Sequence, residues 1–167
     1  EEKGSAQCKS SVIFAGLNTP GKTIIRAKKS RDHTELFLKY LKLPIKIKKK
    51  SNFDEIEVTG EKQFKSFNYV VPGDISSSAF FIVLTLLSKN SKLTIRNVNI
   101  NPSRTGFLTI INKMGGKIKF INKRNLCGEQ VADILVKSQK KFKSINCPVS
   151  LNSNAIDEFL VIFLLAA

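Results

Sequence analysis

The sequence predicts an α+β fold built from a repeated unit. Three apolar stretches at helical spacing begin with small or polar residues, at 5–17, 74–87 and 154–167, so their starts lie about 70 to 80 residues apart. The first two are followed by the same series of segments, in the order helix, strand, helix, strand, strand. Helices and strands that alternate at this density predict a sheet covered by helices rather than a helical bundle.

The first copy can be followed element by element. Its opening stretch, "SAQCKSSVIFAGL", is a helix that ends at Gly16 and the turn "NTPG". The later segments alternate in polarity as half-buried strands do, apart from one polar cap followed by apolar residues at helical spacing. We expect strands at "KTIIRA" (22–27), "IKIKKK" (45–50) and "IEVTG" (56–60), and the second helix within "SRDHTELFLKYLKL" (30–43).

The second copy matches the first segment by segment. Its strands are expected at "KLTIRNV", "KIKFINKR" and "ADILVKS", and its helices in 74–87 and within "NPSRTGFLTIINKMGG". Pro72 and Gly73 interrupt an extended run, so we place the boundary between two domains there, with residues 1–71 in one and 72–167 in the other. The third copy contains only its first helix, which leads us to expect part of a longer protein.

The net charge of +15, from 28 basic and 13 acidic residues, fits a polyanionic partner such as nucleic acid. The excess is almost all lysine, however, and only five arginines and no tryptophan are present to read or stack on bases. Charge runs usually mark solvated faces. A basic nucleic-acid-binding module is therefore the second hypothesis for function, and nucleic acid is not the partner that we expect.

Location and redox state follow from composition. The longest uninterrupted apolar stretch, residues 159–167, is nine residues long, whereas a membrane-spanning helix needs about 20. The start, "EEKGSAQ", lacks the basic and apolar regions of a signal peptide. Three widely spaced cysteines predict neither a disulfide framework nor a zinc site. We expect a cytoplasmic protein with no membrane partner.

The start of the first helix is a candidate anion site. Ser5, Ala6, Gln7 and Lys9 cluster in its first turn, where backbone N–H groups point outward and the helix dipole is positive. A phosphate or carboxylate would fit there. Ordinary capping of the helix by Ser5 explains the same residues without a ligand.

Two further turns carry an arginine beside a helix start. "SRDHTE" (30–35) places Arg31 where its planar fork could bind a phosphate or carboxylate, and Glu35 completes a pattern like a capping box. The single histidine, His33, is expected to be structural. In "NPSRTG" (101–106), Arg104 could hold an anion or anchor the turn. Asp74 and the serines after it are expected to cap the helix at 74–87.

Adjacent carboxylates begin the last apolar stretch, in "AIDEF". The helix dipole would stabilise Asp157 as an anion, which explains its presence without any function. A carboxylate at that place can also act as a general base for a substrate hydroxyl within hydrogen-bond reach. The apolar residues after it predict a surface that is exposed or covered by a partner.

Taken together, the motifs "SAQCKSSVIFAGLNTPGKT", "SRDHTE", "VPGDISSSAF", "NPSRTG", "MGGKI", "GEQVADILVKS" and "AIDEF" resemble, in order and spacing, the 3-phosphoshikimate 1-carboxyvinyltransferase (EPSP synthase) family. The resemblance covers almost the whole chain and favours the glyphosate-tolerant class. It implies an inverse α/β fold of repeated βαβαββ units in two lobes, with 1–71 ending the first lobe and 72–167 starting the second.

The resemblance also implies a reaction. The family transfers the enolpyruvyl group of phosphoenolpyruvate to the 5-hydroxyl of shikimate 3-phosphate, in aromatic amino acid biosynthesis. By motif, Ser5, Ala6 and Gln7 resemble the contacts to shikimate 3-phosphate, Arg31 a further contact, and Asp157 the carboxylate that accepts the 5-hydroxyl proton. No metal or organic cofactor is implied, and the parent enzyme is expected to be monomeric.

Several cationic residues of the family have no counterpart in these 167 residues. The missing groups are the early Lys-Ser and Arg residues, the glycine-rich phosphoenolpyruvate loop and the later Arg and Lys residues. Such cations stabilise the charge of the transition state, which is usually the largest catalytic contribution. We therefore expect the chain by itself to be inactive.

Overall fold

The computed structural model describes residues 4–60 and 65–167. Residues 1–3, part of the acidic start considered above, and 61–64 lie outside the described residues. The chain divides into two compact units, unit 1 (Glu1–Val70) and unit 2 (Val71–Ala167). This division lies one residue before the boundary expected at Pro72, and the assignment of the units to two lobes stays a prediction.

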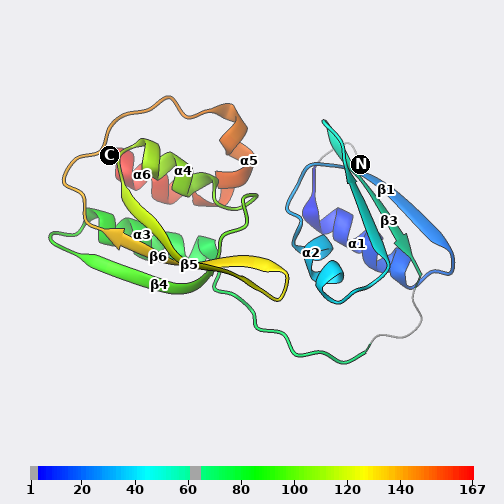
Figure 1. Ribbon diagram of the computed structural model, residues 1–167. Coiled ribbons are helices and arrows are strands. Elements are labelled where there is room, and N and C mark those ends of the chain that lie inside the picture. The colour runs from blue at the N-terminus through cyan, green and yellow to red at the C-terminus, as the bar shows by residue number, and fades with distance from the viewer. Residues whose placement is uncertain (1–3, 61–64) are drawn as a thin grey trace. The chain divides into compact units, whose positions relative to one another are not determined.

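Unit 1 is a three-stranded antiparallel sheet with two helices (Figure 1). The last strand lies in the middle, in the order β1-β3-β2, so the strand that closes the unit pairs with both others. The order helix, strand, helix, strand, strand is confirmed. Its elements are α1 (Ala6–Leu17), β1 (Lys22–Lys28), α2 (His33–Tyr40), β2 (Ile45–Lys49) and β3 (Phe53–Thr59).

The two faces of this sheet differ in chemistry. Ile25, Ile56 and Ile47 lie in register across the three strands, and α1 and α2 contribute Ile13 and Leu38 to the same core. Alternate residues of the strands project to the other face. There the basic residues of β1 and β2 pair with two glutamates of β3, in the ion pairs Lys22–Glu57, Arg26–Glu55, Lys46–Glu57 and Lys48–Glu55. Lysine-rich β2 therefore lies beside acidic partners, as expected of a solvated face.

Unit 2 repeats this topology with the strand order β4-β6-β5. All pairs are antiparallel, and the closing strand is again central. Two 3-10 turns and two helices then extend the unit. The elements are α3 (Ile75–Leu87), β4 (Lys92–Asn99), α4 (Gly106–Lys113), β5 (Lys117–Leu126), β6 (Glu129–Lys137), η1 (Val149–Leu151), α5 (Asn152–Ala155), η2 (Ile156–Glu158) and α6 (Phe159–Ala166), where η marks a 3-10 turn.

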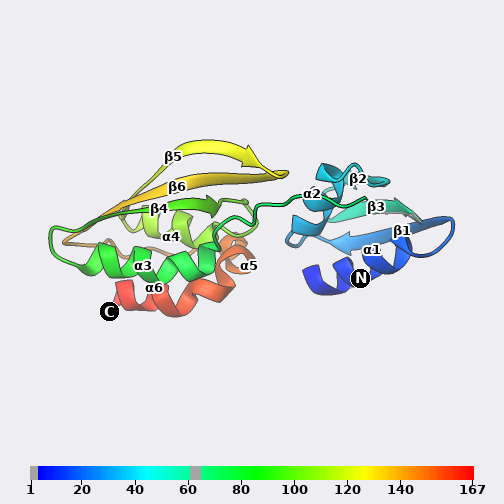
Figure 2. The same ribbon diagram turned by 90° about the horizontal axis from the view of Figure 1, so that it is seen from below.

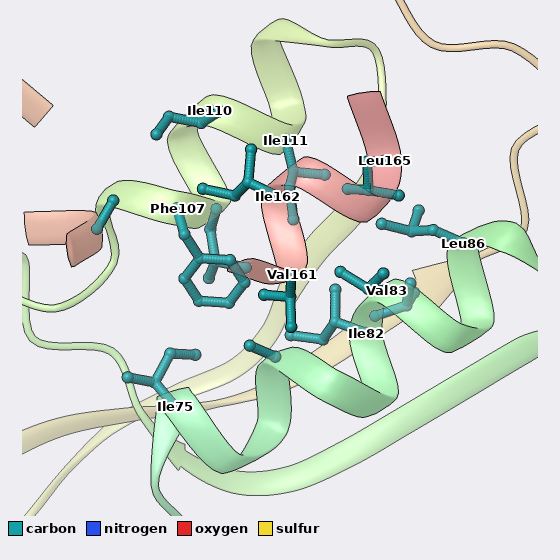
Figure 3. Close-up of a cluster of buried hydrophobic side chains, with 14 of the residues drawn as sticks. Ile75, Ile82, Val83, Leu86, Phe107, Ile110, Ile111, Val161, Ile162 and Leu165 are labelled. Carbon is teal, nitrogen blue, oxygen red and sulfur yellow. The ribbon is translucent and has the colours of Figure 1, made fainter. Parts of the chain in front are cut away.

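The core of unit 2 lies between its sheet and its helices. In Figure 2, α3, α4 and α6 lie on one side of the sheet, and α3 and α6 are neighbours. Figure 3 shows Phe107 and Ile111 of α4 directed toward Ile82 of α3 and toward Val161 and Ile162 of α6. The last helix is thus part of one continuous core with the second repeat.

The expectation of one helix over 154–167 is wrong in its start. Ala155 (φ −131°, ψ 5°) and Glu158 (φ −108°, ψ 2°) depart from helical geometry, so a 3-10 turn separates α5 from the regular helix, which begins at Phe159. Apolar spacing alone does not show this break. The turn contacts α3, as described below.

The outer sides of α3 and α6 remain apolar. Within the described residues, the exposed large apolar side chains of these helices are Phe80, Phe81, Leu84, Leu87, Leu160, Phe163 and Leu164. A helix that is apolar on every side is normally covered on every side. The exposed apolar surface predicted near the C-terminus is therefore present, and it extends to α3.

One helical run in the described part of the chain, Val149–Ala166, has the length and composition of a membrane-spanning segment, with 18 residues and a mean hydropathy of 1.5. The run is divided into η1, α5, η2 and α6 and contains both Asp157 and Glu158. Three of its apolar residues, Val161, Ile162 and Leu165, are buried in the core of unit 2. Because the core helix of a soluble protein meets the same criteria, the run is weak evidence for a membrane span.

Candidate substrate site

Ser5 caps the first helix, as the capping interpretation predicts. Its backbone is extended (φ −120°, ψ 115°), and its Oγ accepts a hydrogen bond from the N–H of Cys8 at 3.2 Å. The N–H of Lys9 donates to the Ser5 carbonyl at 3.0 Å. Ser5 and Ala6 are half-buried and Gln7 is exposed. A capped helix start still presents its dipole and outward N–H groups to an anion, so capping leaves the substrate role of these residues open.

The turn that carries Arg31 lies against this helix start. Lys9 Nζ donates to the carbonyl oxygen of Arg31 at 2.8 Å, and the hydroxyls of Ser10 and Thr34 are 2.6 Å apart. A Cβ on Gly4 would lie 3.0 Å from the carbonyl oxygen of Lys29. The structure therefore brings together the two unit 1 motifs that were predicted to bind substrate.

Lys9 is not one of the anion-binding groups, which corrects the sequence-based cluster. Only 2% of Lys9 is exposed, and its Nζ lies 2.6 Å from Oε1 of the buried Glu35. The sequence spacing could have predicted this burial. Lys9 precedes Ile13 and Gly16 by four and seven residues, so all three lie on the same, buried face of α1. Its ammonium joins α1 to α2 instead of facing a ligand.

The capping box predicted in "SRDHTE" is also absent. Asp32 is the N-cap of α2 but makes no side-chain capping bond, and its Oδ2 lies 3.7 Å from Lys49 Nζ. Glu35, which would complete the box, is turned inward to Lys9. His33 begins α2 and is half-buried.

In unit 2, three sequence motifs meet at the start of α3. Asp74 caps this helix, accepting 2.8 Å hydrogen bonds from the N–H and the hydroxyl of Ser77. Arg104 Nη2 donates to Asp74 Oδ1 at 3.2 Å and also to the Ser76 hydroxyl, which in turn donates to Glu158. Arg104 thus anchors its turn to the protein's own carboxylate, the alternative that the sequence left open.

The pKa of Asp74 lies below its ordinary value. Partial burial opposes ionisation, but hydrogen bonds from Ser77 and Ser76 and the charge of Arg104 outweigh it. A carboxyl whose pKa is lower in the folded state stabilises the fold fully above its unfolded-state pKa of about 3.9 and loses that contribution as the pH falls through the folded-state value. Unit 2 is therefore expected to lose stability at acid pH as Asp74 becomes protonated.

Replacing Asp74 with alanine is expected to lower the free energy of unfolding of unit 2 by about 1 kcal/mol at pH 7 because the helix loses its cap. The difference from the unchanged chain should shrink as the pH falls below about 3.9. Urea unfolding at several pH values, followed through the amide signals of β6, measures it. Ser5→Ala, followed through the amide signals of β3 in unit 1, is the matched control: it removes a neutral cap, so its effect on unit 1 should not vary over that range. Equal pH profiles for the two variants would contradict the assignment.

Asp157 lies in η2 and is exposed, whereas its neighbour Glu158 is only 4% exposed. The two adjacent carboxylates thus face different surroundings, one the protein surface and the other the interior. Asp157 belongs to unit 2, while Ser5, Ala6, Gln7 and Arg31 belong to unit 1. A common substrate cleft for these residues stays a prediction.

The two units offer an internal comparison. Three pairs of residues hold the same positions in the two copies, namely Ser5 with Asp74 as helix N-caps, Gln7 with Ser76 two residues later, and Arg31 with Arg104 two residues before the second helix. In unit 2 the cap is a carboxylate that pairs with the arginine. In unit 1 the cap is the neutral hydroxyl of Ser5.

The described residues contain no group of three or more His, Cys, Asp or Glu side chains that could hold a metal ion. Cys8, Cys127 and Cys147 are free thiols. The arrangement instead offers helix starts, arginines and carboxylates, the groups that bind anions and accept protons.

Comparisons of sequence and structure with known proteins point to one family. The sequence model of one family, EPSP synthase (3-phosphoshikimate 1-carboxyvinyltransferase), matches residues 1–167. A 3-phosphoshikimate 1-carboxyvinyltransferase of Zymomonas mobilis is 41% identical over 164 residues, which are 98% of this chain and 36% of that protein. One from Legionella pneumophila is 43% identical over 166 residues, 99% of this chain and 37% of that protein.

The same relationship is seen in three dimensions. The EPSP synthase of Acinetobacter baumannii superposes with a TM-score of 0.88 at 36% identity, covering 99% of this chain and 37% of that structure, which confirms the predicted fold class. The chain spans about 37% of the length of these relatives. None of these comparisons supports the nucleic-acid-binding alternative. On the family match and these identities, the chain belongs to the EPSP synthase family.

Proposed function

We propose that the chain forms part of an enzyme that transfers the enolpyruvyl group of phosphoenolpyruvate to the 5-hydroxyl of shikimate 3-phosphate. The hydroxyl oxygen bonds to C2 of phosphoenolpyruvate while C3 takes up a proton, which opens the double bond. The tetrahedral adduct then loses phosphate from C2 and a proton from C3, which restores the double bond. Membership of the EPSP synthase family supports this activity. Because the chain spans about 37% of its relatives, the complete reaction needs groups that these 167 residues do not include.

The observation that carries the proposal is the difference between the two repeat copies. In unit 2, Asp74 supplies the anion at the helix start and binds Arg104. In unit 1, Ser5 stands at that position while Arg31 is retained. A helix start capped by a hydroxyl, with an arginine in the turn beside it, suits an anion supplied by a ligand. The phosphate of shikimate 3-phosphate is such an anion.

Each predicted site residue then has a physical role. The hydroxyl of Ser5 and the outward groups of Ala6 and Gln7 bind the phosphate at the start of α1, with Gln7 also near phosphoenolpyruvate. Arg31 adds a charge-assisted hydrogen bond, and the buried ammonium of Lys9 holds its backbone in place. Asp157 accepts the proton of the 5-hydroxyl as a general base.

The proposal extends to the parent enzyme. It works without a metal or organic cofactor, acts as a monomer in the cytoplasm and belongs to the glyphosate-tolerant class. The free thiols of Cys8, Cys127 and Cys147 fit a reducing compartment. Units 1 and 2 belong to its two lobes, which close on the substrates.

Titration of the chain with shikimate 3-phosphate, followed by nitrogen-15 NMR, tests this function. The amide signals of residues 5–8 and 30–33 are expected to shift. Arg31→Ala should weaken binding by about tenfold or more, because a hydrogen bond to a charged group contributes about 1.5–3 kcal/mol. Arg26→Ala, which removes an exposed arginine paired with Glu55, is the matched control and should leave binding unchanged.

Two results would contradict the proposed phosphate site. In one, the ligand shifts signals elsewhere and not at the start of α1. In the other, Arg31→Ala and Arg26→Ala weaken binding equally, as expected for non-specific attraction to a chain of net charge +15. A parallel titration with an oligonucleotide tests the alternative, since phosphate-driven nucleic acid binding weakens steeply with added salt.

A further inference from the structure

Glu158 is a buried carboxylate that the proposed reaction does not use. Only 4% of it is exposed, although it directly follows the exposed Asp157. Its Oε1 accepts a hydrogen bond from the hydroxyl of Ser76 in α3, across 82 residues of sequence. A buried carboxylate without such partners would be costly, so this contact determines where η2 can lie.

Arg104 completes the network. Its Nη2 donates to the Ser76 oxygen, so the Ser76 hydroxyl bridges the guanidinium and the Glu158 carboxylate. The Arg104 side chain is itself only 17% exposed and pairs with Asp74 at 3.2 Å. One cation therefore serves two carboxylates, one directly and one through a hydroxyl. Connected buried hydrogen bonds of this kind rigidify the segments that they join.

The chain just before η2 is held by packing. A Cβ on Gly106, the first residue of α4, would lie 2.7 Å from the backbone of Asn154, so the two segments are in direct contact. Asn154 Nδ2 also donates to the carbonyl of Pro102 at 3.5 Å. The turn Ile156–Glu158 is thus fixed from both ends, by α4 at Asn154 and by α3 at Glu158.

We propose that Glu158 is a positioning residue: the hydrogen bond that it accepts from Ser76, whose oxygen in turn accepts from Arg104, holds the turn Ile156–Glu158 so that Asp157 faces the substrate. This role rests on the proposed function, in which Asp157 accepts the proton of the 5-hydroxyl. A general base must lie within about 2.6–3.2 Å of the group that it deprotonates. A displacement of about 1 Å can lower the rate about 100-fold, so the anchor of the turn matters for the reaction.

Amide hydrogen exchange of the full chain tests the anchor without any activity assay. Glu158→Ala and Ser76→Ala are each expected to speed exchange at residues 156–159, while the amides of β6 keep their protection. The double variant should exchange no faster than the faster single variant because both changes remove the same bond. Glu158→Gln keeps a hydrogen-bond acceptor for Ser76 and should retain most of the protection.

The control is Asp133→Asn, a change at another mostly buried carboxylate of unit 2 that binds Asn97 and Asn122. It should speed exchange near the strand irregularities of the sheet and leave 156–159 unchanged. If Glu158→Ala loosens all of unit 2 equally, or leaves 156–159 unchanged, the positioning role is overturned. Ser76→Ala removes the same hydrogen bond from its donor side, so it tests the contact even where Glu158→Ala does not fold.

Steady-state kinetics test whether the hydrogen bond between Glu158 and Ser76 affects the reaction. In a chimeric enzyme, this chain replaces the matching segment of the Zymomonas mobilis relative. Glu158→Ala is expected to lower kcat by about 10- to 100-fold with little change in the KM for shikimate 3-phosphate, and Glu158→Gln should recover most of it. A loosened turn with unchanged kcat would overturn the positioning role of Glu158 in the reaction, while the hydrogen bond to Ser76 and the enolpyruvyl transfer itself would both stand.

Discussion

Replacing Lys9 with methionine is expected to lower the free energy of unfolding of unit 1 by about 3–5 kcal/mol. The two side chains have similar length, but methionine leaves the carboxylate of Glu35 buried without its cation. Glu35 is 2% exposed, and within the described residues its Oε2 already has no hydrogen-bond partner. The ammonium of Lys9, 2.6 Å from Oε1, is the main group that offsets the cost of burying this carboxylate, and the substitution removes it. The backbone of Arg31 loses its contact as well.

Tyrosine fluorescence during urea unfolding measures this effect specifically. The chain has two tyrosines and no tryptophan, and both tyrosines, Tyr40 and Tyr69, lie in unit 1. The signal therefore reports unit 1 even if unit 2 unfolds separately. Far-UV circular dichroism on the same samples follows the whole chain.

Two further variants sharpen the test of Lys9. Lys22→Met removes an exposed ion pair with Glu57 and should cost at most about 1 kcal/mol. The double variant Lys9→Met with Glu35→Leu replaces the buried pair by apolar groups and should recover much of the loss. Equal costs for Lys9→Met and Lys22→Met would show that the buried pair contributes no more than a surface pair.

The elements of both repeats could be predicted because local signals determine them. Alternating polarity predicts a strand over 22–27, and β1 spans Lys22–Lys28. Ser5 and Asp74 cap the helices α1 and α3, as their residue types predict. Where distant contacts decide, the prediction fails. The helix expected from Asn154 becomes regular only at Phe159, and Glu158, the residue before it, is buried against Ser76, 82 residues earlier.

The strands of unit 2 show a second limit of local patterns. β4 and β5 change register beside the central strand, at Asn97 and Asn122, which have φ values of 56° and 53°. Both asparagines donate to the side chain of Asp133, one through its backbone N–H at 2.9 Å and the other through its amide at 2.8 Å. Asparagine tolerates this left-handed conformation, but nothing local shows that two of them share one carboxylate across a sheet.

Much of the candidate site was also predictable, in position more than in contacts. The sequence placed Ser5 and Arg31 beside helix starts, and the structure joins their motifs through Lys9. The partner of Lys9 could not be read from the first turn alone. A basic residue near a helix start suggests that an anion binds there. Lys9, however, lies on the buried face of α1, and a buried lysine needs an acidic partner inside the fold. Periodicity is the better guide when the two conflict.

Replacing Asp157 with asparagine is expected to give the largest loss of activity, about 100- to 10,000-fold in kcat, in the chimeric enzyme with the Zymomonas mobilis relative. Asparagine has nearly the same size as aspartate but cannot accept the proton of the 5-hydroxyl. Because Asp157 is exposed in η2, the change should leave the free energy of unfolding nearly unaltered. Steady-state kinetics with shikimate 3-phosphate and phosphoenolpyruvate, together with urea unfolding, measure both quantities.

The pattern of kinetic constants distinguishes a proton acceptor from a binding group. An interaction made only in the transition state lowers kcat and kcat/KM equally, whereas loss of a ground-state contact raises KM and leaves kcat unchanged. For Asp157→Asn we expect the first pattern, with shikimate 3-phosphate still binding at the start of α1. Glu57→Gln, a carboxylate on the outer face of the unit 1 sheet, is the control and should keep full activity. A rise in KM at constant kcat would make Asp157 a binding residue, and the proton would then need another acceptor.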